Sequence, residues 1–260
     1  MTTIAEFSDE HHAHFEEYGY ARLGKVLGDV ELAELQQRID AIMLGEFSYP
    51  EMDFQLDGDD AEYAKMPTVS VGHKGDTLQY RKIMGLEQDP VFLTYMQHSL
   101  LRQITRRYIG EDVSIFRAMF MNKPAQQGTI LPWHQDVGIG WGVGHNPTVT
   151  VWTALDPATV ENGCMQIVPG SHQRGVISER HFPSAEQLAE CAPPGSEIDL
   201  EAEPGEAILL NNLLLHRSGV NPTGQSRRAF SIAYMDGATR SVHTGDSYPM
   251  IFGAGALVPA

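Results

Sequence analysis

The second half of the chain alternates short strand-like segments with turn residues. Five segments rich in β-branched and aromatic residues follow Glu111: VSIFRAMFMN, PTVTVWTAL, CMQIVPG, EAILLNNLLLH and RRAFSIAYM. Strands of this length and spacing are typical of an all-β sandwich or barrel. The pattern therefore predicts a jelly-roll core over residues 111–260.

The first 45 residues instead predict two helices around a short extended piece. Ser8 or Asp9 is a suitable cap for the first helix, and Asp29 for the second, because short polar side chains accept hydrogen bonds from free backbone N–H groups. The second helix carries apolar residues at helical spacing, which we expect to be buried: Leu32, Leu35, Ile39, Ile42 and Met43.

Residues 46–76 are rich in Gly, Asp and Pro without a clean period, and we expect them to be irregular. A helical stretch is then expected from Asp89 and Pro90 to Gly110. The predicted fold is mainly β with flanking helices: a double-stranded β-helix core, jelly-roll and cupin-like, packed against N-terminal helices. We predict one domain over residues 1–260, with residues 1–110 as its mostly helical layer and irregular segment.

Composition narrows the choice of partners and compartment. The formal net charge is −16, from 18 Lys and Arg against 34 Asp and Glu, which disfavours nucleic acid and anionic membrane surfaces. Cys164 and Cys191 are the only cysteines, so a reducing, cytoplasmic compartment is expected. Neither a membrane-spanning run nor a secretory signal core is present in the sequence, and the oligomeric state stays open.

The segment LPWHQDVG contains a His-x-Asp pair, His134 and Asp136. On a strand, residues two apart face the same side, so this imidazole and carboxylate would converge. His216 ends the apolar run LLNNLLLH and can lie beside them in a jelly roll. Two histidines and one carboxylate form the metal site of non-haem iron(II) oxygenases. Taken alone, the pair is also compatible with a surface turn that holds a His–Asp hydrogen bond.

Two neighbouring arginines, Arg227 and Arg228, follow His216 in HRSGVNPTGQSRRAF. A guanidinium binds a carboxylate through two parallel hydrogen bonds, which suits the distal carboxylate of 2-oxoglutarate, and Ser218 can add a hydroxyl donor. Since neighbouring residues on a strand face opposite sides, only one of the two arginines can point into the core.

These pieces together resemble the phytanoyl-CoA dioxygenase family. The matching segments, in order, are YRKIMGLEQDP, RAMFMNKP, LPWHQD, VWTALDPATVENGCMQIVPGSH and HRSGVNPTGQSRRAFS. The resemblance implies Fe(II), 2-oxoglutarate and O₂ as cofactors, with His134, Asp136 and His216 as iron ligands and Arg227 as the carboxylate anchor. It also implies a cosubstrate pocket lined by Lys82, Met119, Trp152 and Ser218. Without it, Met119 and Trp152 would be assigned to the core and Lys82 to the surface.

The resemblance also narrows the chemistry. Related halogenases replace the metal carboxylate by a small residue, whereas Asp136 is present here, so halogenation is not expected. The glycine-rich loop VGIGWGVGHNP after the first two ligands carries Trp141, and in this family such loops shape the substrate pocket. The N-terminal region and residues 46–76 match the family poorly, so a small metabolite is a better candidate substrate than phytanoyl-CoA.

We therefore predict an Fe(II)- and 2-oxoglutarate-dependent oxygenase that hydroxylates a small molecule and releases succinate and CO₂. Desaturation, ring closure or epoxidation would use the same residues. Two alternatives remain open from the sequence. A cupin-type dioxygenase or isomerase would keep the triad but give Arg227 no role, and a non-catalytic binding protein on the same fold would not need the triad.

Overall fold

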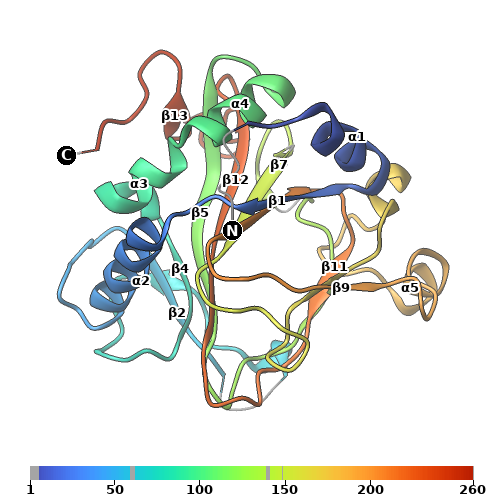
Figure 1. Ribbon diagram of the computed structural model, residues 1–260, viewed down its shortest axis with the longest axis horizontal. Coiled ribbons are helices and arrows are strands. Elements are labelled where there is room, and N and C mark those ends of the chain that lie inside the picture. The colour runs from blue at the N-terminus through green and yellow to red at the C-terminus, as the bar shows by residue number, and fades with distance from the viewer. Residues whose placement is uncertain (1–5, 59–61, 139–140, 148, 260) are drawn as a thin grey trace.

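The computed structural model describes residues 6–58, 62–138, 141–147 and 149–259, and in these ranges it shows two packed β-sheets with flanking helices (Figure 1). Residues Ile139 and Gly140 of the glycine-rich loop lie outside the described residues. No described helix is long and apolar enough to cross a membrane. The fold confirms the predicted jelly-roll core with flanking helices.

The larger sheet follows the order β1-β10-β7-β12-β5-β4-β2-β3, with β13 paired to β5, and the smaller sheet follows the order β6-β11-β8-β9. The strands of the larger sheet are β1 (Tyr20–Lys25), β10 (Glu206–Asn211), β7 (Val149–Ala154), β12 (Arg227–Asp236), β5 (Val113–Lys123), β4 (Tyr80–Met84), β2 (Asp53–Leu56), β3 (Ser70–Val71) and β13 (Met250–Phe252). Those of the smaller sheet are β6 (Leu131–His134), β11 (His216–Ser218), β8 (Met165–Ile167) and β9 (Ile198–Leu200).

The larger sheet is covered by helices on one face and by the smaller sheet on the other. Phe230, Ile232 and Tyr234 of β12 belong to the buried cluster that also contains helical residues, whereas Trp152 and Ala229 belong to a second cluster with residues of β8. Because side chains alternate along a strand, each strand of this sheet serves both layers. The helices are α1 (Asp9–Tyr18), α2 (Asp29–Met43), α3 (Pro90–Met96), α4 (Ser99–Tyr108) and α5 (Ala185–Cys191).

The helix starts agree with the sequence at two of three positions. Ser8 caps α1, and Asp89 caps α3 with Pro90 in the first helical position. Asp29 does not cap α2: the capping residue is Gly28, whose N–H donates to the Glu31 carboxylate at 2.8 Å. Asp29 instead forms an ion pair with Lys25, which removes its carboxylate from the helix start.

Other expectations need correction in detail. The stretch from Asp89 to Gly110 is two helices, because His98 accepts a hydrogen bond from the Leu100 N–H and starts α4. The segment 46–76 contains β2 and β3, which extend the larger sheet beyond β4. Their pairing depends on a neighbouring strand rather than on a local pattern. All five apolar residues named for α2 are buried, as predicted. That residues 1–260 form one domain stays a prediction.

Candidate metal and cosubstrate site

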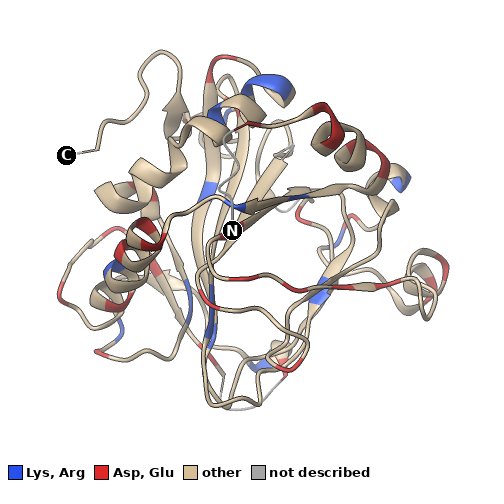
Figure 2. Ribbon diagram, viewed as in Figure 1, with Lys and Arg blue, Asp and Glu red and all other residues tan. Residues whose placement is uncertain are grey.

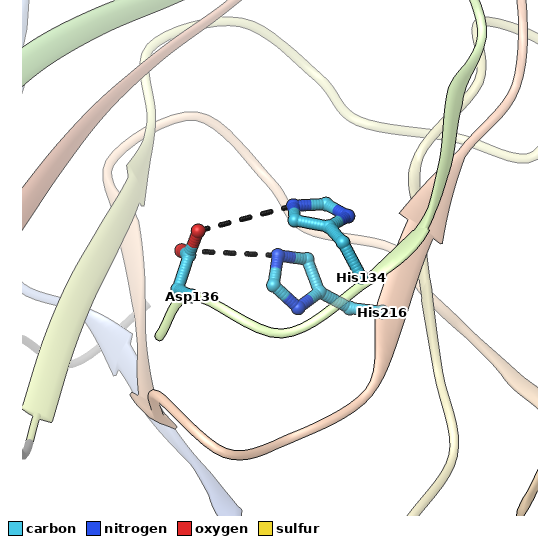
Figure 3. Close-up of side chains that lie close together, drawn as sticks. All are labelled: His134, Asp136 and His216. Atoms are coloured by element: carbon cyan, nitrogen blue, oxygen red, sulfur yellow. Dashed lines mark ion pairs between the residues drawn. The ribbon is translucent and has the colours of Figure 1, made fainter. Parts of the chain in front are cut away.

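Three predicted ligands converge between the two sheets. In the antiparallel pair β6–β11, His216 lies opposite His134, and their ring centroids are 4.0 Å apart. The Asp136 carboxylate lies 3.8 Å from the Nε2 atom of each histidine (Figure 3). The ligand atoms of all three residues lie within 4.8 Å of one another, which is the arrangement that a single metal ion requires.

Backbone carbonyls orient both imidazoles. The Nδ1 atom of His134 donates to the Pro132 carbonyl at 2.8 Å, and the Nδ1 atom of His216 donates to the Leu214 carbonyl at 2.9 Å. Each Nε2 atom therefore keeps its lone pair and faces Asp136, as in metal-binding histidines. Burial holds the pKa of His134 well below its ordinary value, so its ring is in the neutral, metal-binding form.

Asp136 lies beyond the end of β6, so the expected two-residue alternation along one strand is not what places it. β6 ends at His134. The Gln135 side chain holds the next turn in place: its Nε2 donates to the carbonyls of Gly175 at 2.9 Å and Leu213 at 2.6 Å. The Asn212 amide donates to the Asp136 backbone carbonyl at 3.1 Å. Contacts from distant segments thus bring the carboxylate to the histidines.

Asp136 is held in its ionised form. Burial raises the pKa of this carboxyl, but the positive charge of Arg117, helped by its hydrogen bond and by the two neighbouring imidazoles, outweighs burial and holds the pKa below its ordinary value. Arg117, on β5, donates from Nη2 to the Asp136 Oδ1 at 2.8 Å. The carboxylate is therefore both charged and fixed before any ligand is present.

Arg227 is a buried cation that forms no ion pair with a carboxylate of the described residues. It begins β12, is 4% exposed, and lies in the same cavity as the triad, with its guanidinium carbon 5.9 Å from the centre of the Trp152 ring. Its Nε atom has no hydrogen-bond partner among the described residues, and no described carboxylate forms an ion pair with it. Burial lowers the pKa of Arg227 to about 10, so it remains charged at neutral pH.

Arg228 faces the opposite side of the sheet. Its guanidinium donates twice to Asp156, both at 2.8 Å, and once to Asp40 at 2.6 Å. The neighbouring arginines therefore have opposite surroundings, and only Arg227 reaches the cavity, as strand alternation requires.

The other expected cosubstrate residues lie in the cavity as well. Met119, Trp152 and Ser218 are buried in its wall, and Lys82 lines it from β4. Burial lowers the pKa of Lys82 to about 7. No described carboxylate forms an ion pair with Lys82. The placement of Met119 and Trp152 agrees with the resemblance rather than with a purely apolar core.

Several further cavity residues were not identified from the sequence, among them Tyr63, Arg81, Arg117, His181 and Arg217. Arg117 lies two residues before Met119 on β5, so alternation could have revealed it. Arg81 reaches the cavity because β4 is irregular there: Gln55 pairs with Lys82 and Leu56 with Tyr80, which leaves Arg81 as an extra residue. Such a bulge redirects a side chain, and no local signal predicts it.

The fold and these side chains define a jelly-roll protein with a preformed site for one metal ion, with the two-histidine, one-carboxylate donor set that non-haem iron(II) enzymes use. The family model for phytanoyl-CoA dioxygenase matches residues 15–229, and the chain belongs to this family, as the resemblance predicted.

Relatives support the assignment. A probable phytanoyl-CoA dioxygenase of Caenorhabditis elegans is 29% identical over 87% of this chain and 75% of its own length. The peroxisomal phytanoyl-CoA dioxygenase of Rattus norvegicus is 24% identical over 85% of this chain. This chain spans 66% of the length of the rat protein.

Solved structures show the same fold. EctD from S. alaskensis with 2-oxoglutarate and 5-hydroxyectoine has a TM-score of 0.71 at 22% identity, over 100% of this chain and 88% of that one. EctD with bound Fe has a TM-score of 0.68 at 25% identity, over 93% and 81%. The α-ketoglutarate-dependent carbocyclase SnoK from nogalamycin biosynthesis has a TM-score of 0.67 at 20% identity, over 92% and 88%.

Proposed function

We propose that this chain hydroxylates a small-molecule metabolite, with His134, Asp136 and His216 as iron ligands and Arg227 as the anchor of 2-oxoglutarate. The observation that carries the proposal is the presence, in one cavity, of a preformed triad and a buried, unpaired cation. Bound iron(II), with 2-oxoglutarate and O₂, supplies the oxidation that yields succinate and CO₂.

The donor set fits this metal. Two neutral imidazoles and one carboxylate suit iron(II), and three protein ligands leave positions for a bidentate 2-oxo acid and O₂. The hydrogen bonds from the histidines to Pro132 and Leu214 fix the donor atoms in advance. The protein's role is to orient the reactants, because the metal carries out the bond breaking.

Arg227 fits the far end of the cosubstrate. A guanidinium binds a carboxylate with two parallel hydrogen bonds, and Ser218, in the same cavity, adds a hydroxyl donor. Lys82, Met119 and Trp152 complete the wall of the cosubstrate site. In a jelly-roll metal enzyme that does not use a 2-oxo acid, the buried guanidinium of Arg227 would have no ligand to bind. The buried charge of Arg227 therefore favours the oxygenase.

The direct test is anaerobic addition of Fe(II) and 2-oxoglutarate to the purified protein. We expect a visible metal-to-ligand absorption band, followed by succinate release when O₂ is admitted. Asp136→Ala is the blank, since it removes the charged ligand. A wild-type protein that shows neither the band nor succinate would exclude the proposal.

The substrate and compartment belong to the proposal too. A succinate-release screen across small metabolites would identify the substrate. The cytoplasmic location stays a prediction, and the rat relative is named as peroxisomal.

A further inference from the structure

The cavity holds more positive charge than the proposed iron and cosubstrate sites use. The formal charges of iron(II), 2-oxoglutarate, Asp136 and Arg227 cancel. Arg81, Lys82 and Arg117 also line the cavity, and a further lining residue, Arg217, lies 3.8 Å from Glu197. The chain has a net charge of −16, and its peripheral helices α1, α2 and α5 carry acidic residues (Figure 2). Asp136 is shared between Arg117 and the proposed iron site, so this positive charge favours the binding of another anion.

The cavity has two ends. Arg227 lies beside the Trp152 ring at the cosubstrate end, with its guanidinium carbon 5.9 Å from the ring centre. At the metal end, Arg117 donates to Asp136 at 2.8 Å, and the His181 ring lies 4.9 Å from that of His134.

Arg117 is held rigidly and keeps unused donors. Its guanidinium carbon lies 4.6 Å from the centre of the Trp141 ring, and Trp141 stacks on Phe116 with centroids 4.9 Å apart. An N–H group of its Nη2 atom donates to Asp136, and the remaining N–H groups of the guanidinium have no hydrogen-bond partner among the described residues. A planar, preorganised guanidinium beside the metal is suited to bind a second anion.

His181 adds a polar group at the same end. Its ring lies 4.9 Å from that of His134 and 6.3 Å from that of Trp141. Its Nδ1 atom is buried without a hydrogen-bond partner in the described part of the chain, and such an atom is costly unless a ligand satisfies it.

We propose that the substrate oxidised next to the metal carries a carboxylate, which Arg117 binds and His181 helps to position. This inference rests on the proposed function, because it names the substrate class of that site. Arg117 offers one guanidinium at the metal end, because Arg217, which follows His216, lies 3.8 Å from Glu197 and donates to Gln166. A single guanidinium matches a singly charged group rather than a phosphate dianion. Trp141, which supports Arg117, lies in the loop that follows the ligands.

The test uses protein loaded anaerobically with Fe(II) and 2-oxoglutarate. The probes are matched acids and amides: butyrate with butyramide, hexanoate with hexanamide, and benzoate with benzamide, together with phenyl phosphate. Binding is followed by perturbation of the visible band and by the shift in melting temperature. We expect acids to bind about tenfold more tightly than their amides, and benzoate more tightly than phenyl phosphate.

Variants assign the preference to the proposed residues. Arg117→Gln should abolish the difference between acid and amide, and Arg117→Lys should keep part of it. The matched control is Arg174→Gln, since Arg174 is a surface cation 3.4 Å from Glu190 that does not line the cavity. Because Arg117 also bonds Asp136, the band of each variant is recorded first. If Arg117→Gln forms no band, His181→Phe decides, and it should weaken acid binding at least about threefold with the band intact.

The outcomes separate the two proposals. Absence of the band in wild-type protein contradicts the proposed function. A normal band with no binding of any acid, with equal binding of acids and amides, or with a preference for phenyl phosphate overturns the carboxylate assignment alone. So does an acid preference that survives both Arg117→Gln and His181→Phe.

Discussion

Two neighbouring arginines of strand β12 lie on opposite faces of the sheet and have opposite surroundings. On the outer face, Arg228 is bound by the carboxylates of Asp156 and Asp40, next to Phe230 and the helical layer. On the inner face, Arg227 is almost fully buried and has no described carboxylate as a partner. The backbone and residue type are the same, and only the surroundings differ.

This difference distinguishes a structural charge from a functional one. Arg228 is neutralised within the chain, so its interactions contribute to the stability of the fold. Arg227 is buried at a cost in stability that a ligand carboxylate would offset. The cost in stability of burying Arg227 without a carboxylate partner therefore indicates a binding site, in agreement with the trade-off between stability and function.

The largest effect that would test the comparison comes from Arg227→Gln. We expect the Kd for 2-oxoglutarate to rise about 100-fold, because a buried, charge-assisted carboxylate contact is lost. The free energy of unfolding of the ligand-free protein should stay unchanged or rise. Titration of the visible band and urea denaturation measure the two quantities. An unchanged Kd would show that the inner cation is not a cosubstrate anchor.

Arg228→Gln is the matched control, with the opposite expectation. Loss of three hydrogen bonds to Asp156 and Asp40 leaves their carboxylates unpaired and should lower the free energy of unfolding by about 2 kcal/mol. The KM for 2-oxoglutarate should change less than about twofold. Denaturation curves and steady-state kinetics on the same preparation decide, and a large rise in KM would remove the distinction between the faces.

The smallest effect concerns Lys82, another cation of the inner side. Its pKa is about 7 in the folded chain against 10.5 ordinarily, because it is buried. Between these values the unfolded chain binds a proton that the folded chain does not, so the free energy of unfolding rises with pH. Lys82→Met should remove about 1 to 2 kcal/mol of the rise between pH 7 and pH 9.

Urea denaturation of ligand-free wild-type and Lys82→Met proteins at both pH values isolates this contribution, since other groups titrate equally in the two. Equal pH dependence in both proteins would mean that Lys82 keeps an ordinary pKa and that burial on the inner side does not disfavour its charged form.

Several parts of the site could be predicted from the sequence. Alternation predicted that one of Arg227 and Arg228 faces inward, and the His-x-Asp pair with a distant His indicated a metal site. The resemblance supplied what the residues alone left open: that Arg227 is the inward arginine and that Met119 and Trp152 line a pocket. Local caps at Ser8 and Asp89 were also predictable, because a cap depends only on its own turn.

The sequence by itself thus determined the strand periodicity and the local helix caps, which depend on neighbours along the chain, and it indicated His134, Asp136 and His216 as candidate metal ligands. The tertiary structure decided where Asp136 lies beyond its strand, how a bulge turns Arg81 inward, and how His181 reaches the histidines. These features depend on hydrogen bonds and pairings between segments far apart in the sequence, which have no local energetic signature. For that reason the substrate end of the cavity became visible only in the folded chain.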